Sequence, residues 1–523
     1  MKQNKIRGLL AAFALAGVGA GRDLAHASAL PHIVYILADD LGYGDPGCYN
    51  DASKIPTPHI DELARQGIRF TDAHAPSSVC TPTRYGILTG RYCWRTDLTS
   101  GVLDGFDPPL IEPDRLTVPQ LLRQHGYRTA CIGKWHLGMT WQSTAAEPMA
   151  LHGLPPRPGT KVDFAAPPRA GQPSRGFDQW FGISASLDMS PYCFLDGDGL
   201  VNVPNRPLPE ASDMFVGLSA GVVAPGFRPV DVLPQLGRRA AAVIDNHARE
   251  SANRPLFLYF PLPAPHLPVV PVESVRGQGR AGRYGDFVVQ VDQTIGLVLD
   301  ALNRNHMQQN SLVIVSSDNG GLWHWWEAQA PVDRQHGREG GRAEELRRFG
   351  HQSNGPWRGR KADIWEGGHR VPLVARWPAR IPPGIVSDKL VELTDLLATC
   401  AALVGAALPD NAGEDSFSIL PALLQEPATQ PGRDFAVHHS LHGMFAIRHG
   451  PWKLIEGRGS GGFSQPRHLE ASAGEPAGQI YHLGRDPQET RNLWNERPKI
   501  VQRLSSLLKQ LRDSRRSRPV QSR

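Results

Sequence analysis

The chain has 523 residues, a length that suits one large domain with a smaller one and excludes a single small domain. Apolar residues make up 40% of it, and Gly and Pro are frequent, as in a loop-rich globular protein rather than a disordered or fibrous one. The formal net charge of +5 comes from the two ends, because the chain between residues 28 and 502 is net acidic. This charge pattern argues against a nucleic-acid partner.

Residues 1–27 have the layout of a secretory signal peptide: three cations, an apolar run over 8–20, and small residues near a cleavage site. We therefore expect the mature protein to be exported, to the periplasm or outside the cell. The apolar run is too short to cross a bilayer, and no later stretch reaches about 18 apolar residues. No membrane span is expected.

Strand-like and helix-like patterns alternate over residues 33–377. Apolar runs typical of strands buried on both faces lie at 33–38, 127–132, 255–260, 312–315 and 371–377. Helical patterns lie at 60–66, 116–125, 236–248 and 287–303. The alternation predicts an α/β fold: a large domain whose mostly parallel central sheet is flanked by helices.

The character of the sequence changes after residue 431. Short strand-like pieces at 434–438, 444–447, 452–455 and 479–483 precede a helix with one apolar face, formed by Ile500, Val501, Leu504, Leu507, Leu508 and Leu511. We predict a large domain over 30–432 and a small C-terminal α+β domain with an antiparallel sheet over 433–523. The basic tail from residue 503 is interpreted as a solvated, frayed helix end rather than a glycan-binding segment.

Polar side chains lie just past the ends of four of the predicted strands: Asp39 and Asp40, then Lys134 and His136, then His266, then Asp318 and Asn319. Open α/β sheets place their active sites beyond the carboxyl ends of the strands. The four motifs therefore predict one convergent site. The oxygen ligands of Asp39, Asp40, Asp318 and Asn319 suit Ca²⁺ or Mg²⁺, and ligand type alone leaves both open.

Cys80 opens the motif Cys80-Thr81-Pro82-Thr83-Arg84, ahead of a helical run over 85–88. A lone cysteine in a large enzyme is usually a buried, inert thiol. Here Arg84 brings a permanent cation, and a helix N-terminus stabilises anionic groups. These features favour a nucleophile that acts on a sulfate or phosphate ester. The other five cysteines are scattered, so we expect at most one or two disulfides: Cys48, Cys93, Cys131, Cys193 and Cys400.

The Cys80 motif, with Leu88-Thr89-Gly90-Arg91 after it, resembles the signature of the type I sulfatases of the alkaline phosphatase superfamily. Further resemblance lies at 133–138, 176–178, 354–361, 363–372 and 481–487. It implies an alkaline phosphatase-like fold and conversion of Cys80 to formylglycine (3-oxoalanine) by a formylglycine-generating enzyme. The hydrated aldehyde would be the nucleophile, and a covalent sulfo-enzyme the intermediate in hydrolysis of a sulfate ester.

The resemblance also implies roles for individual residues. Asp39, Asp40, Asp318 and Asn319 would hold one Ca²⁺ together with the oxygen of residue 80. The cations Arg84, Lys134 and Lys361 would clamp the sulfate, His136 would bond the hydrated aldehyde, and His266 would protonate the leaving alcohol. Ser186 matches a serine near the sulfate, with Ser184 as a competing candidate.

Two other functions stay open at this point: a phosphodiesterase or phosphonate monoester hydrolase of the same superfamily, and a non-catalytic glycan-binding protein with an unmodified Cys80. Substrate choice should depend on the segments 139–174, 184–224 and 322–360, the first and last of which are interpreted as functional rims or lids. The aromatic cluster at 323–326 is either a sugar platform or rim packing. A sulfated carbohydrate is the favoured substrate, and an exported protein would meet such polymers.

Overall fold

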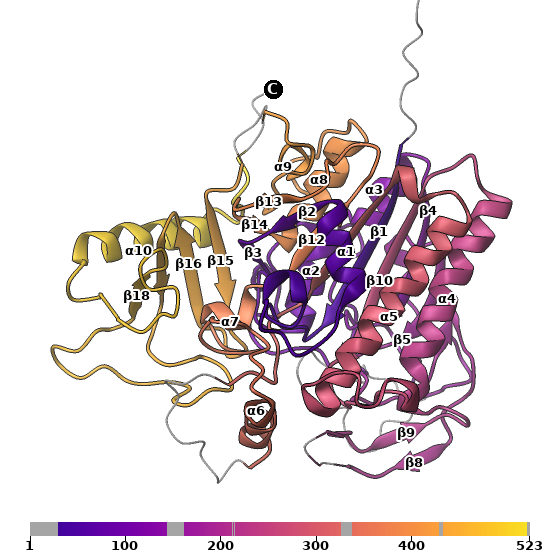
Figure 1. Ribbon diagram of the computed structural model, residues 1–523, viewed down its shortest axis with the longest axis horizontal. Helices are drawn as coiled ribbons and strands as arrows, with labels where there is room; N and C mark the ends of the chain where they lie inside the picture. The colour runs from indigo at the N-terminus through magenta and orange to yellow at the C-terminus, as the bar shows by residue number, and fades with distance from the viewer. Residues whose placement is uncertain are drawn as a thin grey trace, which may run out of the picture.

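The computed structural model describes residues 30–143, 162–211, 213, 215–325, 337–427 and 432–519. The predicted signal peptide and parts of the two predicted lids lie outside these residues. A ten-stranded sheet forms the centre of the molecule (Figure 1). Its order is β13 (Ile385–Ser387), β2 (Ile68–Phe70), β12 (Leu373–Arg376), β11 (Ser311–Ser317), β1 (His32–Asp39), β10 (Leu256–Pro265), β4 (Arg128–Lys134), β5 (Gln179–Ile183), β6 (Leu195–Asp196) and β7 (Gly199–Leu200).

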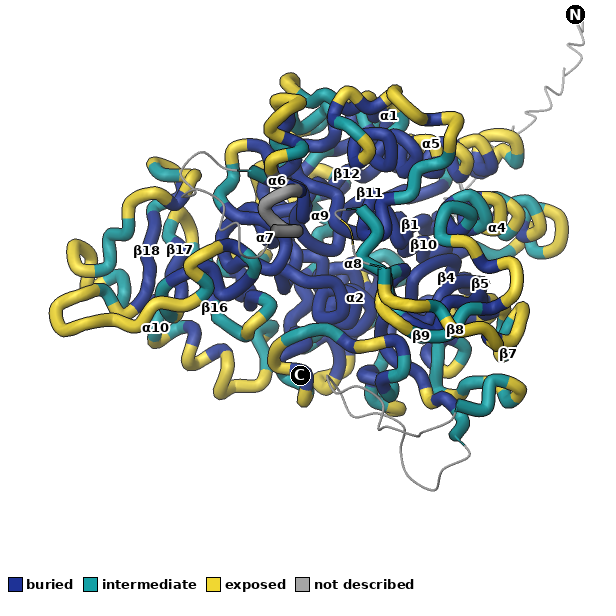
Figure 2. Tube along the Cα trace, turned by 90° about the horizontal axis from the view of Figure 1, so that it is seen from below, coloured by how far each residue is buried: buried dark blue, intermediate teal, exposed yellow. Residues whose placement is uncertain are grey.

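The five strands from β11 to β5 run parallel, and the apolar runs that predicted four of them are buried. All ten residues of β10 are buried, as expected for a strand with both faces covered. Helices α1 (Pro58–Gln66), α4 (Pro229–Glu250) and α5 (Gly282–Arg304) cover one face, and α2 (Cys80–Thr89) and α8 (Leu396–Leu403) cover the other (Figure 2). Helix α3 (Val118–Gln124) packs against α2 and α8. The predicted α/β fold is confirmed.

Three local features differ from the prediction. Strand β12 runs antiparallel to both β11 and β2, so it interrupts the parallel order, while β2 and β13 beyond it pair in parallel. Strands β5 to β7 were not predicted, because each is five residues or fewer and carries little periodicity. Helix α6 (Gly337–Phe349) occupies part of a segment that was interpreted as a loop.

The C-terminal part forms a separate antiparallel sheet, as predicted. Its strands, in order, are β15 (Phe435–His439), β16 (Phe445–His449), β17 (Trp452–Ile455) and β18 (Gln479–His482). Helix α10 (Pro498–Asp513) packs on β16 and β17 and buries Leu504, Leu508 and Leu511. The predicted apolar face of this helix is therefore its contact with the sheet.

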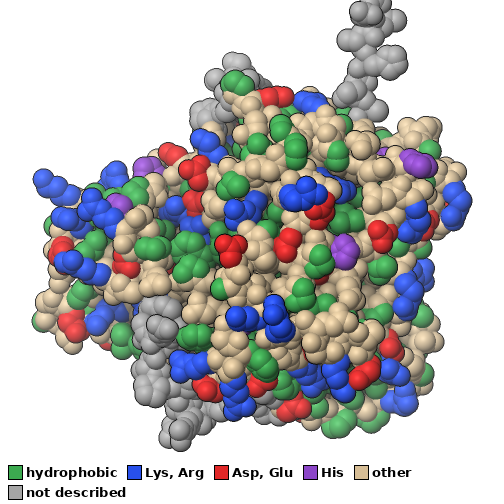
Figure 3. Space-filling view, in the orientation of Figure 1, with side chains coloured by type: hydrophobic (Ala, Val, Ile, Leu, Met, Phe, Trp, Pro, Cys, Tyr) green, Lys and Arg blue, Asp and Glu red, His purple; other side chains and the backbone are tan. Residues whose placement is uncertain are grey.

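The end of the chain is packed, and the prediction of a frayed tail is wrong up to residue 519. The backbone N–H groups of Ser517 and Arg518 donate to the carbonyl of Glu414 at 2.9 and 2.8 Å, and Arg518 Nε donates to the carbonyl of Gly413 at 3.0 Å. Guanidinium groups satisfy several carbonyls at once, and this holds the segment against the large domain. Lys and Arg side chains gather at the end of the molecule that α10 forms (Figure 3).

Within the described residues, no helix combines the length and the apolar character that crossing a membrane requires. All six cysteines are free thiols in the structure. The sequence predicts at most one or two disulfides.

Candidate active site

The ends of three neighbouring strands bring the predicted residues together. In the register of the sheet, Asp39 at the end of β1 faces Pro265 of β10, and the preceding residue faces Ser317 of β11. His266 and Asp318 come directly after these partners. Strand β4, on the far side of β10, ends at Lys134, whose Nζ lies 2.7 Å from Asp39 Oδ2.

Cys80 is the first residue of α2 and is 3% exposed. Its Sγ and carboxylate oxygens of Asp39 and Asp318 lie within 4.8 Å of one another. Burial raises the pKa of the Cys80 thiol, although Lys134 and Lys361 act in the opposite direction. The group as encoded is therefore a protonated thiol at neutral pH, which is a poor nucleophile.

Three buried cations pair with three buried carboxylates in the same site. The pairs are Arg84 with Asp318 (2.7 Å), Lys134 with Asp39 (2.7 Å) and Lys361 with Asp40 (2.8 Å). Lys361 comes from the segment before β12. Because β12 runs antiparallel, this segment lies at the edge where the parallel strands end.

The carboxylates differ in electrostatic environment. Burial acts to raise the pKa of Asp39, but the Lys134, His266, Arg84 and Lys361 side chains together hold it well below its usual range. Burial and the neighbouring Asp39 charge raise the pKa of Asp318. Closely spaced carboxylates of this kind attract a further cation.

The predicted metal ligands fit a hard divalent cation. Asp39 Oδ1 and Asn319 Oδ1 are buried and form no hydrogen bond within the described part of the chain. Asn319 donates its amide to Asp40 Oδ1 at 2.7 Å, so its carbonyl oxygen is left as a ligand. Buried oxygens without donors are costly, and an ion such as Ca²⁺ or Mg²⁺ would satisfy them.

His136 is a neutral side chain with one free acceptor. Its Nε2 lies 2.7 Å from the carbonyl of Leu103, so this nitrogen carries the proton. Nδ1 is buried without a hydrogen-bond partner in the described structure. Burial, with the Lys134 and Arg84 charges, lowers the pKa of His136 well below its usual value. The neutral Nδ1 of His136 can therefore accept a hydrogen bond from a hydroxyl bound in the site. No side-chain pattern would have identified the Leu103 carbonyl that fixes this tautomer.

His266 presents its other nitrogen to the site. Its Nδ1 lies 2.7 Å from the carbonyl of Leu267 and donates to it, and Nε2 lies 3.8 Å from Asp40 Oδ2. Ser186, rather than Ser184, lies beside these groups: its hydroxyl accepts from Lys134 Nζ at 3.1 Å and is 3.4 Å from His266 Nδ1. The structure therefore brings all eleven predicted site residues to one edge of the sheet, as listed here: Asp39, Asp40, Cys80, Arg84, Lys134, His136, Ser186, His266, Asp318, Asn319 and Lys361.

The backbone of the site is strained in places that a sequence pattern does not reveal. Asp40, His136 and Ala362 have positive φ values of 68°, 57° and 78°, which are uncommon for residues other than glycine. Each such residue costs on the order of 1–3 kcal/mol and persists where the surrounding structure holds it. Gly133 is required for a related reason, since a Cβ there would lie 1.9 Å from the carbonyl oxygen of Pro261.

The aromatic cluster at 323–326 is not a sugar platform at its first position. Trp323 is 1% exposed and stacks on Phe215 and Tyr284, with ring centroids 5.3 and 5.6 Å apart. Trp325 is half-buried and donates to the carbonyl of His351. Trp323 and Trp325 therefore pack against their neighbours, which is the alternative that the sequence left open. Trp326 lies outside the described residues.

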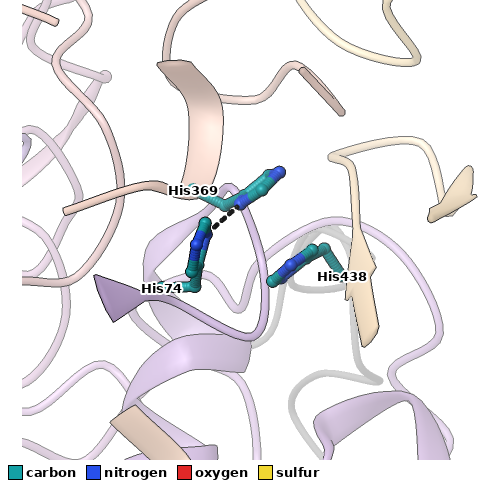
Figure 4. Close-up of side chains that lie close together, drawn as sticks. All are labelled: His74, His369 and His438. Carbon is teal, nitrogen blue, oxygen red and sulfur yellow. Dashed lines mark hydrogen bonds between the residues drawn. The ribbon is translucent and has the colours of Figure 1, made fainter. Parts of the chain in front are cut away.

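A second cluster, His74, His369 and His438, lies where β3 (Ala73–His74), α7 (Glu366–His369) and β15 meet (Figure 4). The rings of His369 and His438 are stacked 3.8 Å apart at 13°. An imidazole lone pair lies in the plane of its ring, so these two rings cannot both point at one ion. Lys453 donates to His369 Nε2 at 3.0 Å, His369 Nδ1 lies 3.1 Å from His74 Nδ1, and His74 Nε2 lies 2.9 Å from Asp72. The cluster is a hydrogen-bonded junction rather than a metal site.

Comparison with known proteins identifies the family. The family model described as Sulfatase matches residues 31–406. An N-acetylgalactosamine-6-O-sulfatase of Bacteroides thetaiotaomicron is 32% identical over 94% of this chain and 95% of its own length, and arylsulfatase A of Homo sapiens is 31% identical over 91% and 87%. A solved structure described under the metabolism of multiple glycosaminoglycans by Bacteroides thetaiotaomicron aligns with a TM-score of 0.75 and 30% identity, over 92% of this chain and 99% of its own. The chain belongs to the sulfatase family and is a sulfuric ester hydrolase.

Proposed function

We propose that this sulfatase hydrolyses the sulfate ester of a carbohydrate and uses formylglycine formed from Cys80 to accept the sulfuryl group. The position of Cys80 carries this proposal. Its side chain is buried at the start of α2, and its Sγ lies within 4.8 Å of carboxylate oxygens of Asp39 and Asp318. The pKa of this thiol is raised. Once formed by a formylglycine-generating enzyme, the hydrated aldehyde supplies two hydroxyls, one to attack sulfur and one to release sulfate.

The oxygens of Asp39, Asp40, Asp318 and Asn319 would hold the metal ion, for which we propose Ca²⁺ before Mg²⁺. When bound, the ion lowers the pKa of a coordinated hydroxyl and adds positive charge beside the sulfate. The chain's own cations only balance its three carboxylates, so an anionic substrate gains from this extra charge. Lys134, Lys361 and Arg84 stabilise the negative charge that develops on the sulfate oxygens.

The two histidines have different roles. His136 is neutral with Nδ1 free, so it can accept a hydrogen bond from a hydroxyl of the hydrated aldehyde at residue 80 and help its later collapse. His266 donates Nδ1–H to the backbone and directs Nε2 toward the site, so a proton on Nε2 can pass to the leaving alcohol oxygen. Ser186 holds Lys134 in place through its hydroxyl.

Two features support the proposed substrate class and the export of the protein. Relatives named N-acetylgalactosamine-6-O-sulfatase and N-acetylgalactosamine-6-sulfatase support a sulfated sugar as substrate. The charge and apolar pattern of residues 1–27 supports export, to the periplasm or outside the cell. We also propose that the large catalytic domain spans 30–432 and the small domain 433–523.

A comparison of ester types tests the function. Enzyme produced with a formylglycine-generating enzyme should release 4-nitrophenol faster from 4-nitrophenyl sulfate than from bis(4-nitrophenyl) phosphate. A Cys80→Ala variant should be inactive on both. Faster cleavage of the phosphodiester would favour the phosphodiesterase alternative, and no cleavage of any sulfate ester would refute the proposal.

A further inference from the structure

The carboxylate of Asp188 has one unused oxygen beside the active site. Its Oδ1 is buried and has no hydrogen-bond partner in the described structure, although the side chain as a whole is 21% exposed. Oδ1 lies 3.9 Å from His266 Nδ1, which is too long for a hydrogen bond. A charged oxygen that is both buried and unpaired is costly unless a ligand supplies a donor.

His266 does not use this oxygen, because its Nδ1–H is already donated to the carbonyl of Leu267 at 2.7 Å. Within the described residues, His266 is the only basic side chain that approaches Asp188 within 4 Å. Oδ1 therefore has no donor within the described residues, and a molecule that enters the site meets the carboxylate through the 21% of the side chain that is exposed.

The backbone at Asp188 is held firmly in place. Its carbonyl accepts hydrogen bonds from the Tyr192 hydroxyl at 2.8 Å and from the Ser219 N–H at 2.9 Å. These two hydrogen bonds fix the main chain that carries the carboxylate beside the site.

We propose that Asp188 accepts a hydrogen bond from a hydroxyl or amide N–H that neighbours the sulfate ester on a sugar. The inference rests on the proposed function, in which His266 marks the side from which the alcohol leaves. A sugar supplies the missing donor, whereas an alcohol without neighbouring hydroxyls leaves the carboxylate unsatisfied. A second sulfate next to the first is disfavoured, because two anions would meet. The preferred substrate class is thus a carbohydrate sulfate with free donor groups beside the ester.

The experiment compares two esters of similar leaving-group basicity. The first is the sulfated galactose, N-acetylgalactosamine or N-acetylglucosamine that the wild-type enzyme cleaves best. The second is cyclohexylmethyl sulfate for a primary ester, or cyclohexyl sulfate for a secondary one. Matching the leaving groups separates recognition from proton donation, since both esters need the same help from His266.

Asp188→Ala should lower kcat/KM for the sugar sulfate about 10- to 100-fold, as expected for a lost hydrogen bond to a charged group, and change it less than about threefold for the cyclohexyl ester. Asp198→Ala is the matched control, because this exposed carboxylate is ten positions away and should leave both values unchanged. Melting curves of both variants confirm folding.

Equal losses on the two esters would overturn the inference, because Asp188 would then act through His266. Unchanged kinetics on the sugar would overturn it as well. A wild-type enzyme that cleaves only esters without sugar hydroxyls would refute the inference while leaving sulfate ester hydrolysis intact. A wild-type enzyme that cleaves no sulfate ester would refute the proposed function itself.

Discussion

The buried side chain of His324 should lower the free energy of unfolding in acid, and the pKa shift that burial causes gives the size of this effect. It is 2% exposed, and its Nδ1 accepts the backbone N–H of Asn354 at 3.1 Å, so it must be neutral. The Asn354 side chain in turn bonds both backbone groups of Gly321 at 2.7 and 3.0 Å, and Gly321 accepts the N–H of Lys361. His324 therefore supports the loop that carries Lys361.

Burial, helped by the Arg360 charge, lowers the pKa of His324 from 6.5 to about 3. The unfolded chain takes up this proton below pH 6.5 while the folded chain does not, so stability is full above that value and falls as the pH falls. A pH of about 5 lies about 1.5 pH units below the pKa of the histidine in the unfolded chain, so protonation stabilises the unfolded state by about 2 kcal/mol there.

Urea unfolding of the wild type and of His324→Asn, at about pH 8 and about pH 5, measures this difference. The Asn carbonyl oxygen takes the place of Nδ1 as acceptor but does not titrate. The wild type should lose about 2 kcal/mol more stability than the variant between the two pH values, since all other titrating groups are shared. Equal losses in the two proteins would refute the reasoning.

Three further predictions concern the site and its support. Lys134→Met should lower kcat/KM on 4-nitrophenyl sulfate by about 10²–10³-fold, because the sulfate loses a positioned cation, and a change below about threefold would contradict this role. His266→Gln should lower kcat/KM by about 10²–10⁴-fold for a sugar sulfate but far less for 4-nitrophenyl sulfate, whose leaving group needs no proton; equal losses would exclude a general acid. Lys453→Met should cost about 3–5 kcal/mol, because Glu366 and Glu489 lose a buried cation that lies 3.1 and 2.9 Å away. The exposed Lys509→Met is its control in thermal unfolding, and similar melting points for the two variants would contradict the estimate.

Removal of the metal gives an independent prediction. Dialysis against a chelator should abolish activity, and Ca²⁺ should restore it, since the free oxygens of Asp39 and Asn319 would again have a ligand. Full activity in protein shown to be metal-free by elemental analysis would contradict the site.

The convergence of the site was predictable because the strands that carry it are strongly apolar. The carboxyl ends of parallel strands lie at the same edge of a sheet. Asp39, His266 and Asp318 could therefore be assigned to one edge from their positions after three apolar runs. Lys361 was assigned by resemblance only. Its approach depends on the antiparallel direction of β12, which a single apolar run does not encode.

Other features depend on contacts that no local pattern carries. Trp323 was a candidate platform because aromatic clusters are common at sugar sites, but packing against Phe215 and Tyr284 buries it. The positive φ of Asp40 and His136 is imposed by the surrounding fold, not by residue type. The basic tail was interpreted as solvated because charged ends usually are, whereas the carbonyls near Gly413 bind it.

The chemical state of residue 80 tests the central claim most directly. Mass spectrometry of the peptide that contains Cys80, from protein made with and without a formylglycine-generating enzyme, measures it, with sulfate release assayed on the same samples. We predict the aldehyde at residue 80 in the first sample, and activity in proportion to its content. Full sulfatase activity in protein whose residue 80 is an unmodified thiol would contradict the account.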